Sequence, residues 1–351
     1  MKKIKLSIIV CAYNEENSIK KCIEKLINQV IDYNNIEIII IDNESKDQTY
    51  HIASECIKNS LFKNITLFSI EHCPLTGSRN FGLKVARGDY VAYIDADGYI
   101  MDKWFSRLIT NIEIDFDVFL GSVSINPSSS FFSKSIFYGH FLPSLESRSR
   151  ENKIIGANMA FKRSKLLSVN GFHTVSTDRG DETLIFSLLK EKFKSLKIIY
   201  DKSCKVINSY PERASMWFSQ QFQEGKSDRN AEHLKKFNYK KTFKLVLKST
   251  SIVLPIVLLV DLFLNVNLGI FVNLLLLLFI VRHLVRWKYY FYSILNGFKN
   301  IGIRYLFFLP IIILGSLSLD FGYLFGSSNR LIKNYGISPS GKLLKKYSKN
   351  I

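Results

Sequence analysis

Strand-like and helix-like segments alternate along the first 120 residues, and this alternation decides the class of fold. Apolar runs rich in β-branched residues occur at residues 6–12, 36–41, 65–70, 90–95 and 118–123. Helical patterns separate the first four of these runs, at residues 18–29, 47–58 and 78–85. Strands joined by helices of this length form βαβ units and a parallel sheet. The second run, IEIIIID, is almost wholly apolar, which is typical of a strand covered by helices on both faces.

The polar residues that follow these strands are the candidates for function. The first strand ends in CAYNEE, the second in DNESKDQT and the fourth in DADG. Ligands of parallel sheets bind beyond the carboxyl ends of the strands, so we expect these side chains at one rim. Three polar strand ends at one rim indicate a bound cation, or a sugar and a base.

Asp95 and Asp97 stand two residues apart at the end of the fourth strand. In an extended strand such side chains share one face, and two carboxylates that close repel each other. A bound divalent metal ion would relieve this repulsion. The alternative is a plain turn after a strand, because Asp-Gly is a common turn pair.

The chain is basic, with 48 Lys and Arg against 30 Asp and Glu and a net charge of +18. Much of the excess flanks long apolar blocks that begin after Lys241, as in KKFNYKKTFKLVLK, RHLVRWK and KLLKKYSK. Basic residues in such places are attracted to anionic lipid, by roughly 1 kcal/mol per Lys or Arg near the surface. Charge placed this way indicates membrane lipids as partners and argues against nucleic acid.

The apolar blocks predict an α-helical membrane region. Residues 249–281 are uncharged except for Asp261, and as one helix they would be about 50 Å long, well beyond a hydrocarbon core of ~30 Å. We therefore predict a hairpin over 242–283, with Asp261 near the far interface. A third apolar block lies at 305–325 between two basic segments. Because basic segments stay cytoplasmic, a re-entrant or in-plane segment is preferred here over a plain third span.

The other segments complete the expected organisation. Residues 125–150 are interpreted as a loop whose aromatic part, FFSKSIFYGHFL, is either a lip on lipid or buried. The five cysteines lack C-x-x-C spacing and indicate buried thiols in a reducing compartment. The N-terminus is interpreted as a first strand rather than a signal peptide. The expected parts are a catalytic α/β domain over 1–236, the membrane region over 237–326 and a basic cytoplasmic tail over 327–351.

The strings SIIVCAYNEE, IIIIDNESKDQT and GSRNFGLKVARGDYVAYIDADG occur in this order, and together they resemble the family 2 glycosyltransferases of GT-A fold. A lone D-x-D motif is weak evidence, whereas the ordered series is specific. The resemblance covers residues 5–229, and the apolar region beyond looks like that of membrane-attached members. It implies a nucleotide-sugar-binding α/β fold with a mostly parallel sheet flanked by helices. The Q-x-x-R-W motif of processive synthases is absent, which argues against a polymer-extruding enzyme.

The resemblance also implies a nucleotide pocket. Ala12, Tyr13 and Glu15 would line this pocket after the first strand. Asp42, at the end of the second strand, would contact the base or the ribose of the nucleotide-sugar. Arg79, in SRN, would lie near the nucleotide. The alternative interpretation is a surface arginine without a functional role.

A metal site and a catalytic base follow from the same resemblance. Asp97 would bind Mg²⁺ or Mn²⁺ directly, and Asp95 would lie nearer the ribose or a metal-bound water. Asp181 and Glu182 fall where the family carries its acidic base at a helix start. Their order is reversed here, so the base stays open between the two, with Asp181 narrowly preferred. Both acids could instead simply favour a helix N-terminus.

These roles describe sugar transfer with loss of a diphosphate. A divalent cation would stabilise the charge on the leaving oxygen, and a carboxylate would deprotonate the acceptor hydroxyl, giving inversion. The resemblance implies a hexosyltransferase of cell-envelope polysaccharide biosynthesis, multi-pass in the cell membrane, with its catalytic domain in the cytoplasm. The acceptor would be lipid-linked or a surface glycan. Transfer to polyprenyl phosphate and a catalytically silent binding or scaffold protein are the alternatives.

Overall fold

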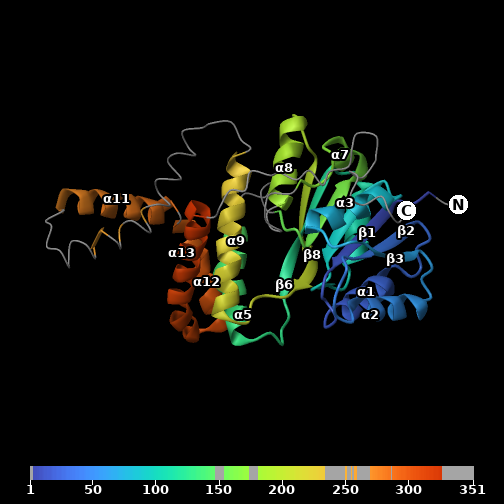
Figure 1. Ribbon diagram of the computed structural model, residues 1–351, viewed down its shortest axis with the longest axis horizontal. Helices are drawn as coiled ribbons and strands as arrows, with labels where there is room; N and C mark the ends of the chain where they lie inside the picture. The colour runs from blue at the N-terminus through green and yellow to red at the C-terminus, as the bar shows by residue number, and fades with distance from the viewer. Residues whose placement is uncertain are drawn as a thin grey trace. The chain divides into compact units, whose positions relative to one another are not determined.

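The computed structural model describes residues 3–146, 154–173, 181–233, 250, 254, 257–258, 269–285 and 287–325. These residues form two compact units (Figure 1). The sheet unit comprises described residues up to 127 and between 154 and 209. The helical unit comprises described residues from 128 to 146 and from 210 to 325.

The sheet unit is built on a mixed sheet. Its described strands follow the order β3-β2-β1-β4-β7-β6-β8-β5. Their bounds are β1 Leu6–Ala12, β2 Ile36–Asp42, β3 Ile65–Ser69, β4 Tyr90–Asp95, β5 Tyr99–Ile100, β6 Val118–Ile125, β7 Asn158–Lys162 and β8 Ile198–Asn208. The first four strands in the order pair in parallel, as the βαβ pattern predicts. β7 is antiparallel to both β4 and β6, and β5 is antiparallel to β8.

Helices cover both faces of this sheet, and two hydrophobic clusters lie between the layers (Figure 1). One face packs on α1, α2 and α4, and the other on α3, α7 and α8. Along β1 the burial alternates, since Ile8 joins the first cluster and Ile9 the second. This explains why the strands carry apolar residues at nearly every position. The helix bounds are α1 Ile19–Val30, α2 Thr49–Lys58, α3 Leu75–Val85, α4 Trp104–Glu113, α7 Arg163–Ser168 and α8 Asp181–Lys192.

The predicted strands and helices of the first 125 residues are confirmed to within a few residues. The expectation of a mostly parallel sheet is correct for β3, β2, β1 and β4 and for the parallel pair β6 and β8, whereas β7 and β5 run antiparallel to their neighbours. Hydrophobic pattern reveals that a strand exists but carries no signal for its direction, so the insertion of β7 between β4 and β6 was not predictable. The two-residue strand β5 was missed because it is too short to show a period.

The helical unit corrects the prediction of a loop over residues 125–150. The described part of this segment contains α5 Phe131–Ile136, the π-helical turn η1 Phe137–Phe141 and α6 Leu142–Glu146. Ser130 begins α5, since its side-chain oxygen accepts a hydrogen bond from the Ser133 amide at 3.1 Å. This cap, and the burial of Ile136 and Phe137, offset the weak helix propensity of the serines and aromatics.

The other described helices of this unit follow in the chain. They are α9 Ala214–His233, α11 Gly269–Val285, α12 Trp287–Ile301, the 3₁₀-helix η3 Ile303–Phe308 and α13 Leu309–Phe325. Tyr305 holds three of the elements together, because its ring lies in contact with Gly139 of η1 and Gly297 of α12. Its hydroxyl lies 2.7 Å from Ser293 Oγ.

The membrane prediction is only partly supported. In the described part of the chain, one helical stretch, Ile303–Leu324, is long and apolar enough to cross a membrane; buried helices of soluble proteins can pass the same criterion. Apart from residues 250, 254 and 257–258, the first arm of the predicted hairpin lies outside the described residues, as does the tail after 326. The second arm overlaps α11, which has 17 residues. The described residues therefore contain one candidate span, which does not support the predicted multi-pass arrangement.

Candidate functional site

The carboxyl ends of β1, β2 and β4 form one rim of the sheet unit. In the parallel register, Ala12 lies beside Asp42 and Cys11 beside Asp95. The strand ends predicted to converge are thus neighbours in space. Burial raises the pKa of the Cys11 thiol well above its usual range, so this thiol is a neutral part of the wall.

The D-x-D segment does not continue the strand as expected. β4 ends at Asp95, and the Gly98 amide donates a hydrogen bond to the Asp95 carbonyl at 3.2 Å, which places Asp97 in a turn. Ala96 is buried, whereas Asp95 and Asp97 are partly exposed. The two carboxylates therefore both reach the surface, but a turn rather than strand alternation brings this about.

Arg79 of α3 is the centre of a buried ion network. Its side chain is 3% exposed, with Nη1 2.5 Å from Asp181 Oδ2 and Nη2 3.2 Å from Asp95 Oδ1. Burial by itself lowers the pKa of Arg79, but the carboxylates of Asp181 and Asp95 outweigh it and hold the pKa above its ordinary value. The alternative of a surface arginine is therefore wrong. This single cation joins three segments: α3, the end of β4 and the start of α8.

Asp181 and Glu182 begin α8, but their surroundings differ. Asp181 is almost fully buried against Arg79. Glu182 is partly exposed, and burial of its carboxylate together with the charge of Asp181 raises its pKa to about 8. Gly156 lies beside both side chains, since a Cβ there would be 3.1 Å from Arg79 Nη2 and 3.7 Å from Glu182 Oε2. Glu182 is thus a carboxyl group that exchanges its proton near neutral pH at the edge of the network.

Asp42 is 3% exposed at the end of β2. Its Oδ2 accepts a hydrogen bond from the Ser45 amide at 3.3 Å, whereas Oδ1 is buried and has no hydrogen-bond partner among the described residues. A buried carboxylate oxygen without a donor is costly, and a ligand N–H or O–H would lower this cost. Next to it, Asn43 bonds the backbone of Cys73 in both directions, at 2.7 and 3.0 Å, and so fixes the loop after β3.

Tyr13, which the resemblance placed in the pocket, forms an aromatic pair with His72, a residue that the sequence reasoning missed. Their ring centroids are 4.5 Å apart, and Tyr13 is 43% exposed. His72 is held by its ring Nδ1, 3.2 Å from the Asn43 carbonyl. His72 follows β3, and the rule that polar residues after parallel strands line the ligand site could have identified it, had it been applied to β3 as well.

Glu15 has a bracing contact in the loop after β1. Its amide donates to Thr49 Oγ1 at 2.6 Å, and its carboxylate accepts a hydrogen bond from Ser18 at 2.7 Å. Burial raises the pKa of Glu15. Asp47 accepts from the Thr49 amide at 3.0 Å, in agreement with a capping role at the start of α2.

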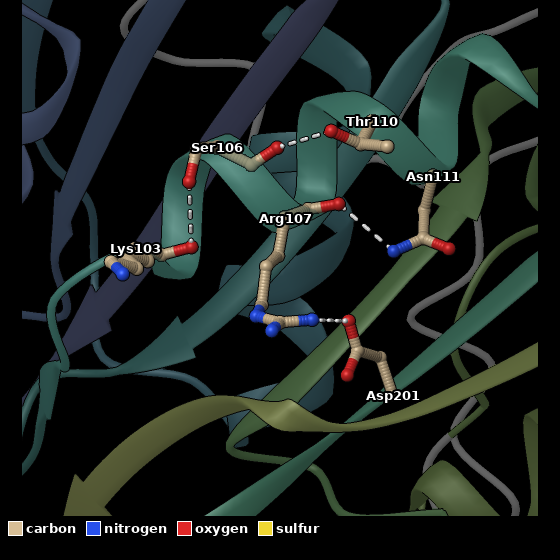
Figure 2. Close-up of a pocket in the computed structure, with 6 residues that line it drawn as sticks. All are labelled: Lys103, Ser106, Arg107, Thr110, Asn111 and Asp201. Carbon is tan, nitrogen blue, oxygen red and sulfur yellow. Dashed lines mark hydrogen bonds and ion pairs between the residues drawn. The ribbon is translucent and has the colours of Figure 1, made fainter.

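Two further observations delimit the site. The described residues contain no group of three or more His, Cys, Asp or Glu side chains placed to hold a metal ion by themselves. A surface pocket of about 320 Å³ between α4 and β8 is lined by none of the predicted site residues (Figure 2). Its polar groups largely bond one another; Arg107, for example, pairs with Asp201 at 3.3 Å.

Comparison with known proteins agrees with the resemblance seen in the sequence. Residues 7–169 match the sequence model of the family described as Glycosyl transferase family 2, so this part of the chain is similar to that family. The solved mannosyltransferase PcManGT from Pyrobaculum calidifontis, in complex with GDP-Man and Mn²⁺, has the same fold. Its TM-score is 0.58 at 15% identity, over 93% of this chain and 89% of that chain.

Two curated relatives are similar in sequence over part of the chain. Glycosyltransferase GlyA of Streptococcus pneumoniae is 32% identical over 140 residues, 39% of this chain and 19% of that protein. The UDP-Glc:alpha-D-GlcNAc-diphosphoundecaprenol beta-1,3-glucosyltransferase WfaP of Escherichia coli is 36% identical over 113 residues, 30% of this chain and 39% of that protein. The aligned part is thus well under half the length of either relative.

Proposed function

We propose that this protein is a membrane-attached, inverting glycosyltransferase that moves a sugar from a nucleotide-sugar to a lipid-linked or surface-glycan acceptor. The observation that carries this proposal is the buried network of Arg79, Asp95 and Asp181, with Glu182 at its edge. The network holds the D-x-D segment next to a carboxyl group that titrates near neutral pH. A donor site and a base are the two parts that such a transfer requires.

The nucleoside would bind over β1 and β2. Asp42 would accept a hydrogen bond from the base or ribose, and its buried Oδ1 supports this role. Tyr13 and His72 offer an aromatic surface for the base. Ala12 and Glu15 would shape the pocket, with Glu15 acting through the loop that it braces.

Asp97 would hold a Mg²⁺ or Mn²⁺ ion, with Asp95 nearby. The donor set fits such an ion, because hard divalent cations prefer carboxylate oxygens and Mg²⁺ typically takes one or two of them plus phosphate oxygens. One or two protein carboxylates are therefore enough, and a cluster of three or more metal-ligating side chains, which the described residues lack, is not required. When bound, the ion would neutralise the charge that grows on the leaving diphosphate.

We assign the base to Glu182 rather than to Asp181, which the sequence narrowly favoured. Asp181 is buried and ion-paired with Arg79, so its carboxylate is already engaged. The raised pKa of Glu182 suits a group that accepts a proton near neutral pH. Glu182 would take the proton of the acceptor hydroxyl while that oxygen bonds to the anomeric carbon and the bond from this carbon to the donor phosphate breaks. The nucleoside diphosphate leaves with that electron pair, and the configuration inverts.

The acceptor class and location are also proposals. WfaP transfers glucose to a diphosphoundecaprenol-linked sugar, which supports a lipid-linked acceptor here. An apolar C-terminal region and its basic flanks support attachment to the cytoplasmic face of the membrane. We retain the domain bounds of 1–236, 237–326 and 327–351 as part of this proposal.

Transfer to polyprenyl phosphate is a second candidate, which one observation favours. Because the pKa of Glu182 is about 8, this group is mostly protonated at pH 7. A phosphate acceptor is already ionised and needs no base. If Glu182→Gln leaves the transfer rate unchanged across pH, this second candidate replaces the first.

The test is a hydrolysis screen of the purified protein against UDP- and GDP-sugars, with and without Mg²⁺ or Mn²⁺. We expect turnover of one donor that depends on metal, and a loss of about 10²-fold or more in Asp97→Asn, by analogy with the loss of one preorganised stabilising group. Asp102→Asn is the matched control, because the side chain of Asp102 is 94% exposed outside the site. Equal turnover in Asp97→Asn at saturating metal would contradict the metal assignment.

A further inference from the structure

The helical unit carries exposed apolar side chains that the candidate site does not use. On α12, Phe291, Ile294, Leu295 and Phe298 are 40–52% exposed. Their spacing of three and four residues places them on one face of the helix. They therefore form a stripe on α12 rather than scattered exceptions.

The opposite face of α12 is fixed to its own unit. Tyr289, Ser293 and Asn296 are buried. Ser293 Oγ donates a hydrogen bond to the Gly139 carbonyl of η1, and Asn296 Nδ2 donates to Glu146 Oε2 of α6 at 2.7 Å. These polar bonds determine which face of α12 is turned outward, so the apolar stripe is presented by a packed scaffold.

Exposed apolar side chains continue into the next two elements. Ile303, Leu306 and Phe307 of η3 are 44–81% exposed, and Leu314 and Phe321 of α13 are 50% and 46% exposed. The basic residues Lys299 and Arg304 are exposed between the two groups. We infer that the nine exposed apolar residues of α12, η3 and α13 share one side of the helical unit, and we call these nine residues the apolar face.

α13 packs against α9 along a side about 100° around the helix from Leu314 and Phe321, and the two helices lie side by side (Figure 1). The contact is close at three glycines. A Cβ on Gly315 would be 2.2 Å from Trp217 Nε1, one on Gly322 would be 1.9 Å from the Phe222 carbonyl oxygen, and one on Gly225 would be 1.8 Å from the Leu319 carbonyl oxygen. Ser318 Oγ also donates to the Phe218 carbonyl at 2.8 Å.

This packing conflicts with a bilayer-spanning α13. The α9 stretch beside it reads WFSQQFQEGK and includes Glu224 and Lys226. If α13 crossed the membrane in this packing, α9 would enter the hydrocarbon with it. A charged residue costs about 2.5–3.5 kcal/mol near the bilayer centre and less toward the interface. Glu224 and Lys226 flank Gly225, which contacts Leu319 and Tyr323 near one end of the candidate span, so most of the cost would come from the three glutamines. Surface burial of α13 avoids the penalty, because α9 then stays on the aqueous side.

We propose that the apolar face lies side-on in the interface of an anionic bilayer, so that η3 and α13 rest in the membrane surface without crossing it. This inference rests on the proposed attachment of the enzyme to a membrane. Lipid is the occupant that fits, because exposed aromatic and aliphatic residues are combined with Lys299 and Arg304, the composition of interfacial helices that bind anionic headgroups. The inference places the helical unit on the surface that carries a lipid-linked acceptor.

Depth measurements on the full chain test this inference. Single cysteines replace Phe307, Leu314 or Phe321, each is labelled with an NBD fluorophore, and the protein is reconstituted in phosphatidylglycerol-containing vesicles. Quenching by lipids with a doxyl group at carbon 5 is compared with quenching at carbon 12. The parent chain, with its five native cysteines, sets the labelling background. A label at Leu61, which is 79% exposed in the sheet unit, is the matched control.

A side-on face predicts stronger quenching at carbon 5 than at carbon 12 for all three labels, and none at Leu61. A spanning helix predicts the reverse at Leu314, near the middle of Ile303–Leu324, with shallow labels at Phe307 and Phe321. That result would overturn the inference. Absence of quenching at all three positions in protein that co-floats with vesicles would also overturn it, since a protein partner or a second copy would then cover the face.

The basic residues of the helical unit give a second, independent test. Each exposed Lys or Arg near an anionic surface strengthens binding roughly fivefold, so Lys299→Glu/Arg304→Glu should weaken carbon-5 quenching at Phe307 in anionic vesicles and leave it unchanged in phosphatidylcholine vesicles. None of these readouts involves sugar transfer. A protein with shallow labels but no transferase activity would contradict the proposed function alone, whereas an active enzyme with a deep Leu314 would contradict only this inference.

Discussion

Replacing Arg79 with methionine should destabilise the sheet unit far more than loss of an ordinary salt bridge. The Arg79 and Asp181 side chains are each 3% exposed and in contact at 2.5 Å, so the substitution leaves a buried carboxylate without its counter-ion. Breaking a buried pair in this way costs about 3–5 kcal/mol. The contact with Asp95 adds less, because that side chain is 34% exposed. For a unit of this size, the loss corresponds to a melting temperature lower by about 6–20 °C.

The measurement is thermal unfolding of the detergent-solubilised full chain, followed by a probe of the sheet unit, at matched pH and salt. Arg107→Met is the control: Arg107 is 45% exposed in its pair with Asp201, and its loss should cost no more than about 1 kcal/mol. The double variant Arg79→Met/Asp181→Asn should recover most of the loss, since it removes the unpaired charge as well. Two results would contradict this reasoning. One is a double variant whose loss of stability equals the sum of the losses of Arg79→Met and Asp181→Asn. The other is an Arg79→Met variant that loses no more stability than Arg107→Met.

Four further outcomes are expected. Because only the deprotonated carboxylate is a base, transfer should rise about tenfold per pH unit below pH 8 and level off above it, and Glu182→Gln should abolish this dependence. The pKa of Glu182 is raised in the folded state, so its contribution to the free energy of unfolding is complete below pH 4.5 and is lost as pH rises through about 8. Glu182→Gln should therefore have a higher melting temperature than the parent at pH 9 and nearly the same one at pH 5. Asp42→Asn should weaken nucleoside diphosphate binding about 10- to 100-fold in calorimetry with little change in melting temperature. Gly322→Ala, which would set a methyl group against the Phe222 carbonyl, should destabilise the α9–α13 pair by about 1–3 kcal/mol, measured by denaturant unfolding of the helical unit.

The residues of the rim could be predicted from sequence because their positions follow from local rules. Each of β1, β2 and β4 has a period and a polar end, and parallel strands bring their carboxyl ends together. Asp42 and Asp95 are accordingly where the pattern placed them. The reason given for Asp97 was wrong, since the side chain follows a turn rather than strand alternation. His72 was within reach of the same rule at the end of β3.

Other features depend on contacts between distant segments, for which one sequence has no signal. Arg79 and Asp181 are 102 residues apart, and nothing in the sequence around either residue identifies its ion-pair partner. The antiparallel insertion of β7 is equally non-local. Residues 131–146 were interpreted as a loop because serines and aromatics are weak helix formers, and the buried partners that stabilise these helices come from α12 and η3.

The buried network also explains why Glu182, rather than its neighbour, is suited to act as a base. Arg79 forms a buried ion pair with one carboxylate of the two, so Asp181 is fixed at the first turn of α8 and cannot release its partner without a large loss of stability. Burial raises the pKa of Glu182, and the negative charge of Asp181 beside it raises this pKa further. One acid is thus committed to structure and the other is left with a pKa near the working pH. In this arrangement the reversed order Asp-Glu is no obstacle to catalysis, because the contact with Arg79 decides which of the two acids stays available.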